Sequence, residues 1–118
     1  MEMRKFEAGE AIFVEGDKGN VAFILKSGQI KITVKVKDDT SRTLATVGPG
    51  SIFGEMALVD NTPRVASAIA LEEGEAMVIR EPEFQKRLAK SDPVIALLLK
   101  IYTERLRKQT VQLAGRMH

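Results

Sequence analysis

Glycine interrupts the first two thirds of the chain at short intervals, and this spacing constrains the fold more than any other feature of the sequence. Because glycine suits tight turns, the intervals between glycines limit the length of the strands that can form. Residues 29–36 alternate between aliphatic and polar side chains, the pattern of a strand with one buried face. Further short, mostly apolar runs predict strands at 11–14, 21–25, 43–47, 65–71 and 76–80.

Many short strands without a long helix between them predict a protein that is mainly β, with helices only at its C-terminal end. The expected architecture is an antiparallel β jelly-roll barrel, or double-stranded β-helix. We expect one domain over residues 1–118, with the β-roll at about 5–80 and C-terminal helices at about 81–114, because 118 residues suit a single core.

The last third of the chain has a helical period. Residues 81–90 begin with a proline near their start and predict a short amphipathic helix. Ser91-Asp92-Pro93 is a capping sequence for a longer helix from Val94 to about Ala114, and Gly115 is a stop signal. We expect the apolar stripe of this helix to pack against the barrel, with a coiled-coil seam as the alternative. The stripe consists of Ile95, Leu99, Tyr102, Leu106 and Leu113.

The composition excludes several classes of protein. The chain has no cysteine, and its one histidine is the last residue, so disulfide scaffolds, histidine-based triads and multi-histidine metal sites are excluded. A small metal-dependent jelly-roll enzyme such as a cupin is excluded for the same reason, and we expect no enzymatic activity. No apolar run is long enough to cross a membrane and no secretory signal is visible, so we expect a cytoplasmic protein without a membrane anchor.

The charge is unevenly distributed. Residues 1–83 carry a formal charge of −4 and residues 84–118 a formal charge of +6. A basic end of this kind can meet nucleic acid or an acidic partner, but the chain has one tyrosine and no base-reading motif. We therefore interpret it as a solvated helix face and expect no nucleic-acid binding by this chain alone.

Residues 48–67 carry the features that predict chemistry. Gly54 followed by Glu55-Met56-Ala57-Leu58 suits a tight turn that opens a short helix, and unpaired amides at a helix start attract anions. Arg64 follows nine residues after Glu55 and precedes a strand, so its forked guanidinium can reach the same helix start and bind a phosphate diester. A surface ion pair between Glu55 and Arg64 is the plain alternative.

The same segment carries a family resemblance. Phe53-Gly54-Glu55-Met56-Ala57-Leu58 with Pro63-Arg64 and Ala66-Ser67 resembles the phosphate-binding cassette of cyclic nucleotide-binding domains. That family includes regulatory subunits of cAMP-dependent kinase, cyclic-nucleotide-gated channels and bacterial catabolite activators. The resemblance covers residues 5 to about 113, with further landmarks at Gly9-Glu10, Ile12-Phe13, Glu15-Gly16-Asp17, Gly19, residues 24–28 and Gly48-Pro49-Gly50.

The resemblance implies a role for each position of the cassette. Glu55 should accept from the ribose 2′-hydroxyl beside the Gly54 backbone, and Arg64 should pair with the exocyclic phosphate oxygens. The amides of Ala57 and Ala66 and the Ser67 hydroxyl should complete the anion site. Val65, directly after the arginine, favours cAMP over cGMP, and the long helix should contact adenine. The candidate ligand-binding residues are Gly54, Glu55, Met56, Ala57, Arg64, Val65, Ala66, Ser67, Arg105, Gln109 and Thr110.

These features predict a regulatory sensor in which the cyclic nucleotide draws the C-terminal helix over the cassette. A homodimer through that helix, or an effector protein of unknown identity, would receive the signal. The alternative is a degenerate member that binds no nucleotide and acts as a scaffold for other proteins. The family's N-terminal helical segment and a following helix-turn-helix do not occur in this sequence, which is expected of a stand-alone sensor or of an excised domain.

Overall fold

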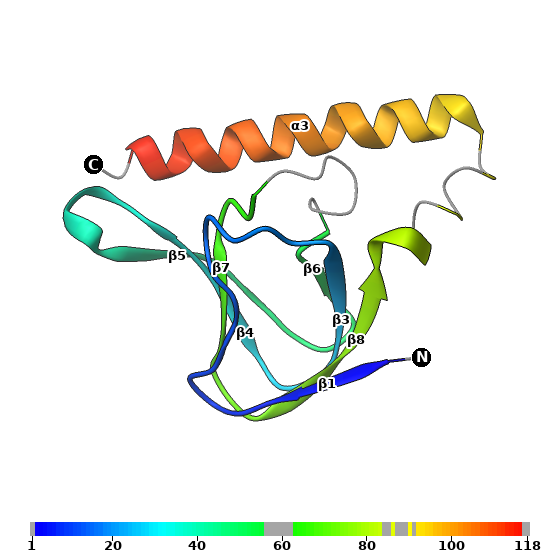
Figure 1. Ribbon diagram of the computed structural model, residues 1–118. Coiled ribbons are helices and arrows are strands. Elements are labelled where there is room, and N and C mark those ends of the chain that lie inside the picture. The colour runs from blue at the N-terminus through cyan, green and yellow to red at the C-terminus, as the bar shows by residue number, and fades with distance from the viewer. Residues whose placement is uncertain (1, 56–62, 84–85, 87–89, 91, 117–118) are drawn as a thin grey trace.

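The computed structural model describes residues 2–55, 63–83, 86, 90 and 92–116. Within these residues, the strands form two four-stranded antiparallel sheets that enclose a barrel (Figure 1). One sheet has the order β1 (Met3–Phe6), β8 (Gly74–Arg80), β3 (Val21–Ser27), β6 (Ile52–Phe53). The other has the order β2 (Ala11–Phe13), β7 (Ser67–Ala70), β4 (Ile30–Lys35), β5 (Ser41–Val47). The predicted antiparallel β-roll is confirmed.

Local sequence patterns account for most strand positions. The alternating run at 29–36 forms β4, whose Ile30 and Val34 side chains are fully buried. The turn expected after it contains the short 3₁₀ helix η1 (Lys37–Asp39). The strand predicted at 65–71 begins only at Ser67, because the backbone of Arg64 pairs with the β2–β3 loop instead of with a sheet. The short strand β6 was not predicted, since two residues are too few to show a period.

Apolar side chains from both sheets fill the barrel. Large residues on β3 and β4 meet small alanines on β7 and β8, so that the two inner faces pack closely. The rings of Phe13, Phe23 and Phe53 stack on one another, with centroids 5.2–6.3 Å apart. These three rings come from β2, β3 and β6, and they tie together the two sheets near the start of the cassette.

The long helix α3 (Pro93–Arg116) begins as the sequence predicts. The Asp92 carboxylate accepts a hydrogen bond of 2.8 Å from the Val94 amide, so Asp92 caps the helix and Pro93 occupies its first turn. The expected stop at Gly115 is wrong, because the helix continues to Arg116. A glycine inside a helix costs only about 1 kcal/mol and does not by itself end it.

The position of α3 corrects a second expectation. The helix extends across one end of the barrel, while β1 and the turn after it lie toward the other end (Figure 1). The side chains of Ile95, Leu99, Tyr102 and Leu106 are 40–57% exposed, so this part of the stripe does not pack into the barrel as expected. The Leu113 side chain lies outside the described part. Over the described residues, no helix has the length and apolar character needed to span a membrane.

The short helix expected at 81–90 is described only in part, with helical backbone at residues 81–83 and 86. The helix expected to open at Gly54 falls largely on residues 56–62, which lie outside the described residues.

Two leucines provide a matched test of the core. Leu25 on β3 is 0% exposed, whereas Leu71, just after β7, is 47% exposed. Leu25→Ala should lower the free energy of unfolding by about 2–5 kcal/mol, because it removes buried surface and leaves a cavity. Leu71→Ala should lower it by less than about 1 kcal/mol. Urea titrations of both variants measure the difference, and equal losses would contradict this description of the core.

Candidate functional site

A hollow of about 210 Å³ lies between the barrel and α3, and we call it the Arg64 hollow. Most of its described lining residues are apolar, and three are charged: Glu55 from the start of the cassette, Arg64 from its end and Arg107 from α3. The remaining lining residues are Phe13, Ile32, Val47, Ile52, Phe53, Gly54, Val65 and Ala66.

The backbone on either side of Arg64 is fixed by the β2–β3 loop. The Arg64 amide donates to the Asp17 carbonyl, and the Arg64 carbonyl accepts from the Gly16 amide, both at 2.8 Å. Two backbone hydrogen bonds, one in each direction, therefore form a bridge between the loop and the end of the cassette, although these segments are far apart in the sequence. This bridge provides the rigid base from which the arginine side chain extends.

The guanidinium of Arg64 is held on several sides. Nη1 donates to the Gly54 carbonyl at 2.8 Å and Nη2 donates to the Val21 carbonyl at 2.7 Å. The guanidinium carbon lies 4.1 Å from the centre of the Phe13 ring, a distance suited to a cation–π contact. Only 7% of the residue is exposed. The arginine is thus a buried cation with a defined orientation.

Two glycines make room for this side chain. A Cβ atom at Gly19 would overlap Nε and the guanidinium carbon of Arg64. A Cβ at Gly54 would lie 2.8 Å from Nη1, and the φ of +76° at Gly54 is itself unfavourable for other residues. Both glycines were landmarks of the sequence, and the structure gives them a steric reason.

The charge of Arg64 is only partly compensated by the described residues. Burial lowers the pKa of Arg64, and Asp17 and Glu55 act in the opposite direction, while Arg107 lowers it further. A guanidinium remains charged at neutral pH in spite of such a shift. Its Nε is buried and has no hydrogen-bond partner in the described part of the chain. A buried cation with an unsatisfied N–H suits a site that receives an anion.

Some of the predicted cassette residues line the hollow, and others lie outside the described residues. Gly54, Glu55, Arg64, Val65 and Ala66 all line the Arg64 hollow. Glu55 and Arg64 both line the hollow, but the described contacts include no ion pair between them. The alternative prediction of a surface ion pair between these two residues is therefore wrong. Met56 and Ala57 lie outside the described residues.

Ser67 is placed differently from the expectation. Its hydroxyl accepts a hydrogen bond of 2.8 Å from the Glu15 amide, and Ser67 is not among the residues that line the hollow. In this structure the Ser67 hydroxyl therefore fixes the β2–β3 loop.

The helix contributes a residue that sequence reasoning missed. Arg105 and Gln109 are exposed and do not line the hollow, and the Thr110 side chain is outside the described part. Arg107 lines it instead and donates to the Pro63 carbonyl at 2.7 Å. Two residues along a helix correspond to a rotation of about 200°, so Arg105 and Arg107 face different directions. The sequence contains this spacing but does not show which face meets the barrel.

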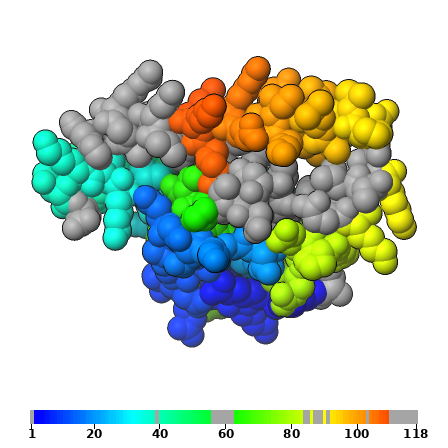
Figure 2. All heavy atoms as spheres, turned by 45° about the horizontal axis from the view of Figure 1, so that its top comes forward, coloured from blue at the N-terminus to red at the C-terminus, as the bar shows by residue number. Residues whose placement is uncertain are grey.

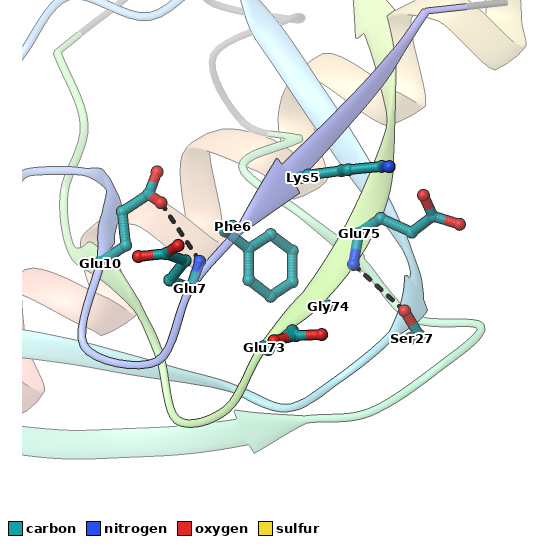
Figure 3. Close-up of a pocket in the computed structure, with 8 residues that line it drawn as sticks. All are labelled: Lys5, Phe6, Glu7, Glu10, Ser27, Glu73, Gly74 and Glu75. Atoms are coloured by element: carbon teal, nitrogen blue, oxygen red, sulfur yellow. Dashed lines mark hydrogen bonds between the residues drawn. The ribbon is translucent and has the colours of Figure 1, made fainter.

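A second, larger hollow of about 540 Å³ is unsuited to an anion. Figure 3 shows Glu7, Glu10, Glu73 and Glu75 around it, and Lys5 is the one basic residue among its described lining residues. Excess carboxylates repel a phosphate, so the anion-binding features of the described residues point to the Arg64 hollow.

Comparison with known proteins identifies the family. The profile of the cyclic nucleotide-binding domain matches residues 3–91. The cyclic AMP receptor protein of Thermus thermophilus is 32% identical over 110 residues, which cover 93% of this chain and 51% of that protein. The chain belongs to the cyclic nucleotide-binding domain family.

Solved structures agree with this assignment. The cAMP-bound form of the EAL enzyme Bd1971 is 34% identical, with a TM-score of 0.88, over 96% of this chain and 30% of that one. Its cGMP-bound form is 35% identical, with a TM-score of 0.84, over 94% of this chain and 30% of that one. The chain spans about half the length of the curated relatives it matches, such as the Thermus protein.

The contact between Gly19 and Arg64 can be tested without a ligand. Gly19→Ala should lower the free energy of unfolding by about 1–3 kcal/mol, because the new methyl group forces the buried guanidinium to move. In an Arg64→Ala background, the same glycine substitution should be nearly neutral. Chemical denaturation of the four proteins completes the cycle. An equal loss in both backgrounds would show that Arg64 is not what limits the space at Gly19.

Proposed function

We propose that this chain is a regulatory domain that binds cAMP in the Arg64 hollow. The observation that carries the proposal is the buried Arg64 guanidinium, whose Nε lacks a partner in the described residues and which shares the hollow with the Glu55 carboxylate. An anion next to a hydroxyl-bearing group satisfies both side chains. A cyclic nucleotide carries these two groups on one sugar ring.

The lining of the hollow fits such a ligand. Arg64 binds the exocyclic phosphate oxygens through charge-assisted hydrogen bonds, and Glu55 accepts from the ribose 2′-hydroxyl. Gly54 and Ala66 also line the hollow, and the amide of Ala66 belongs to the proposed anion site on family resemblance. The amide of Ala57 and the neighbouring Met56 belong to the same proposed site, on family resemblance. Among the described lining residues, two guanidinium groups and one carboxylate sum to one positive charge, which matches the single negative charge of a cyclic phosphate.

Base preference rests on a smaller set of features. Val65, which lines the hollow directly after Arg64, has no hydroxyl group to meet the amino group of guanine, and this favours cAMP. Arg105, Gln109 and Thr110 remain candidates for adenine contacts if α3 turns or shifts when the ligand binds. The cGMP-bound structural relative makes cGMP the natural competitor to test.

We further propose that residues 1–118 act as one domain whose output is the position of α3. A ligand that bridges the cassette and α3 binds the closed arrangement better than an open one, and this difference in affinity provides the signal. The exposed apolar stripe at Ile95, Leu99, Tyr102 and Leu106 supports α3 as the contact with a second copy of the chain or with an effector protein. The role is regulatory and non-catalytic.

Removal of Arg64 tests ligand binding directly. Arg64→Ala should abolish micromolar cAMP binding in isothermal titration calorimetry, because loss of charge-assisted bonds costs more than an order of magnitude in affinity. The matched control is Arg42→Ala, since Arg42 is an exposed arginine on β5 that does not line the hollow. This control should bind cAMP like the wild type.

The same titrations discriminate the alternatives. Wild-type affinity in Arg64→Ala would refute the assignment of the phosphate site. A wild-type protein that binds neither cAMP nor cGMP would instead be a degenerate scaffold. In competition, a preference for cGMP over cAMP would show that Val65 does not select adenine.

Hydrogen exchange tests the coupling to α3. Saturating cAMP should slow amide exchange in α3, because the closed arrangement restricts opening of the helix from the barrel. The Arg64→Ala variant under the same conditions is the control and should show no slowing. Identical protection of α3 in the wild type with and without cAMP would contradict the proposed coupling.

A further inference from the structure

Arg107 differs from its neighbours on α3 in its surroundings. Its side chain is half-buried, whereas those of Arg105, Leu106, Lys108 and Gln109 are exposed. It donates to the Pro63 carbonyl at 2.7 Å and lines the Arg64 hollow. In Figure 2 the deep-orange end of the coloured part of α3 meets the green segment that begins at residue 63. Arg107 therefore links the helix to the end of the cassette.

The contact brings two like charges together. Pro63 immediately precedes Arg64, and both arginines line the same hollow. Their proximity is also seen in the pKa of Arg64, which Arg107 lowers in addition to the effect of burial. Among the described lining residues, Glu55 is the one carboxylate beside the two guanidinium groups.

An anion placed between the two arginines would remove this repulsion. Guanidinium groups bind phosphate through several N–H donors in one plane, so one side chain can hold a backbone carbonyl and a phosphate oxygen at once. The hollow is also shielded by apolar side chains, which makes its electrostatic interactions stronger than those at an open surface. The favourable position for a phosphate is therefore defined from both the barrel and the helix.

We propose that Arg107 is a second anion-binding residue of this site, which binds from α3 the same phosphate that Arg64 binds from the barrel. This inference rests on the proposed function and adds a ligand contact from the helix. The phosphate then acts as a bridge between two cations on separate elements. Closure of α3 depends on the charge of the ligand as well as on contacts with its base.

Four substitutions distinguish the effect of the positive charge of Arg107 from the effect of its position on α3. Arg107→Ala removes the whole interaction, while Lys108→Ala removes the exposed basic residue next to it on the same helix. Arg107→Gln retains a donor for the Pro63 carbonyl but has no charge, and Arg107→Lys retains the charge. Thermal melting first establishes that all four variants fold.

Calorimetry with cAMP then gives the expected order of affinities. Arg107→Ala and Arg107→Gln should each bind about tenfold more weakly than the wild type, because each lacks the charge-assisted bond. Lys108→Ala and Arg107→Lys should stay within about threefold of the wild type. The wild type should also lose more affinity than Arg107→Gln as salt is raised from 50 to 500 mM, owing to screening of one more charge.

Wild-type affinity in Arg107→Gln would overturn the inference and leave the proposed function intact, since Arg107 would then act only through Pro63. Equal losses in Lys108→Ala and Arg107→Ala would overturn it as well, by showing a general effect of helix charge. Absence of binding in the wild type would overturn the proposed function and this inference together.

Discussion

Burial of one positive charge, that of Arg64, organises the functional end of this molecule. The guanidinium needs carbonyl acceptors, and it takes them from Gly54, just after β6, and from Val21, at the start of β3. It also needs space, which Gly19 provides, and an aromatic ring for a cation–π contact, which Phe13 provides. Because desolvation of a cation is costly, each of these contacts is required for the arginine to stay inside. The Arg64 side chain therefore joins the start of the cassette to β3, while the Arg64 backbone joins the end of the cassette to the β2–β3 loop.

Much of the fold could be predicted because the local patterns agree with the tertiary structure. The alternation at 29–36 became β4, and Asp92-Pro93 became the start of α3, since in both cases neighbouring residues determine the outcome. Strand ends were less predictable. Val65 and Ala66 have strand-like side chains, yet the pairing of the Arg64 backbone with residues 16 and 17 keeps them out of β7.

The candidate site was predictable on the cassette side and not on the helix side. Glu55 and Arg64 line the same hollow because a short segment of the chain carries both, and the family resemblance is strongest in that segment. The face that α3 turns toward the barrel depends on how the whole helix docks, which its weak apolar pattern does not determine. As a result Arg105 and Gln109 were chosen from the sequence, whereas the structure brings Arg107 to the hollow.

The backbone bridge between Arg64 and the β2–β3 loop has a consequence for how this domain acquires its activity. Residues 16–17 and 64 are separated in the chain by β3, β4, β5 and β6, so the bridge forms only when these strands have folded back on one another. Partly folded chains therefore present no competent site, and any ligand of this hollow acts selectively on the native state. Occupancy then protects the protein from unfolding and proteolysis by mass action. The cellular abundance of such a protein would itself follow the concentration of the molecule that it binds.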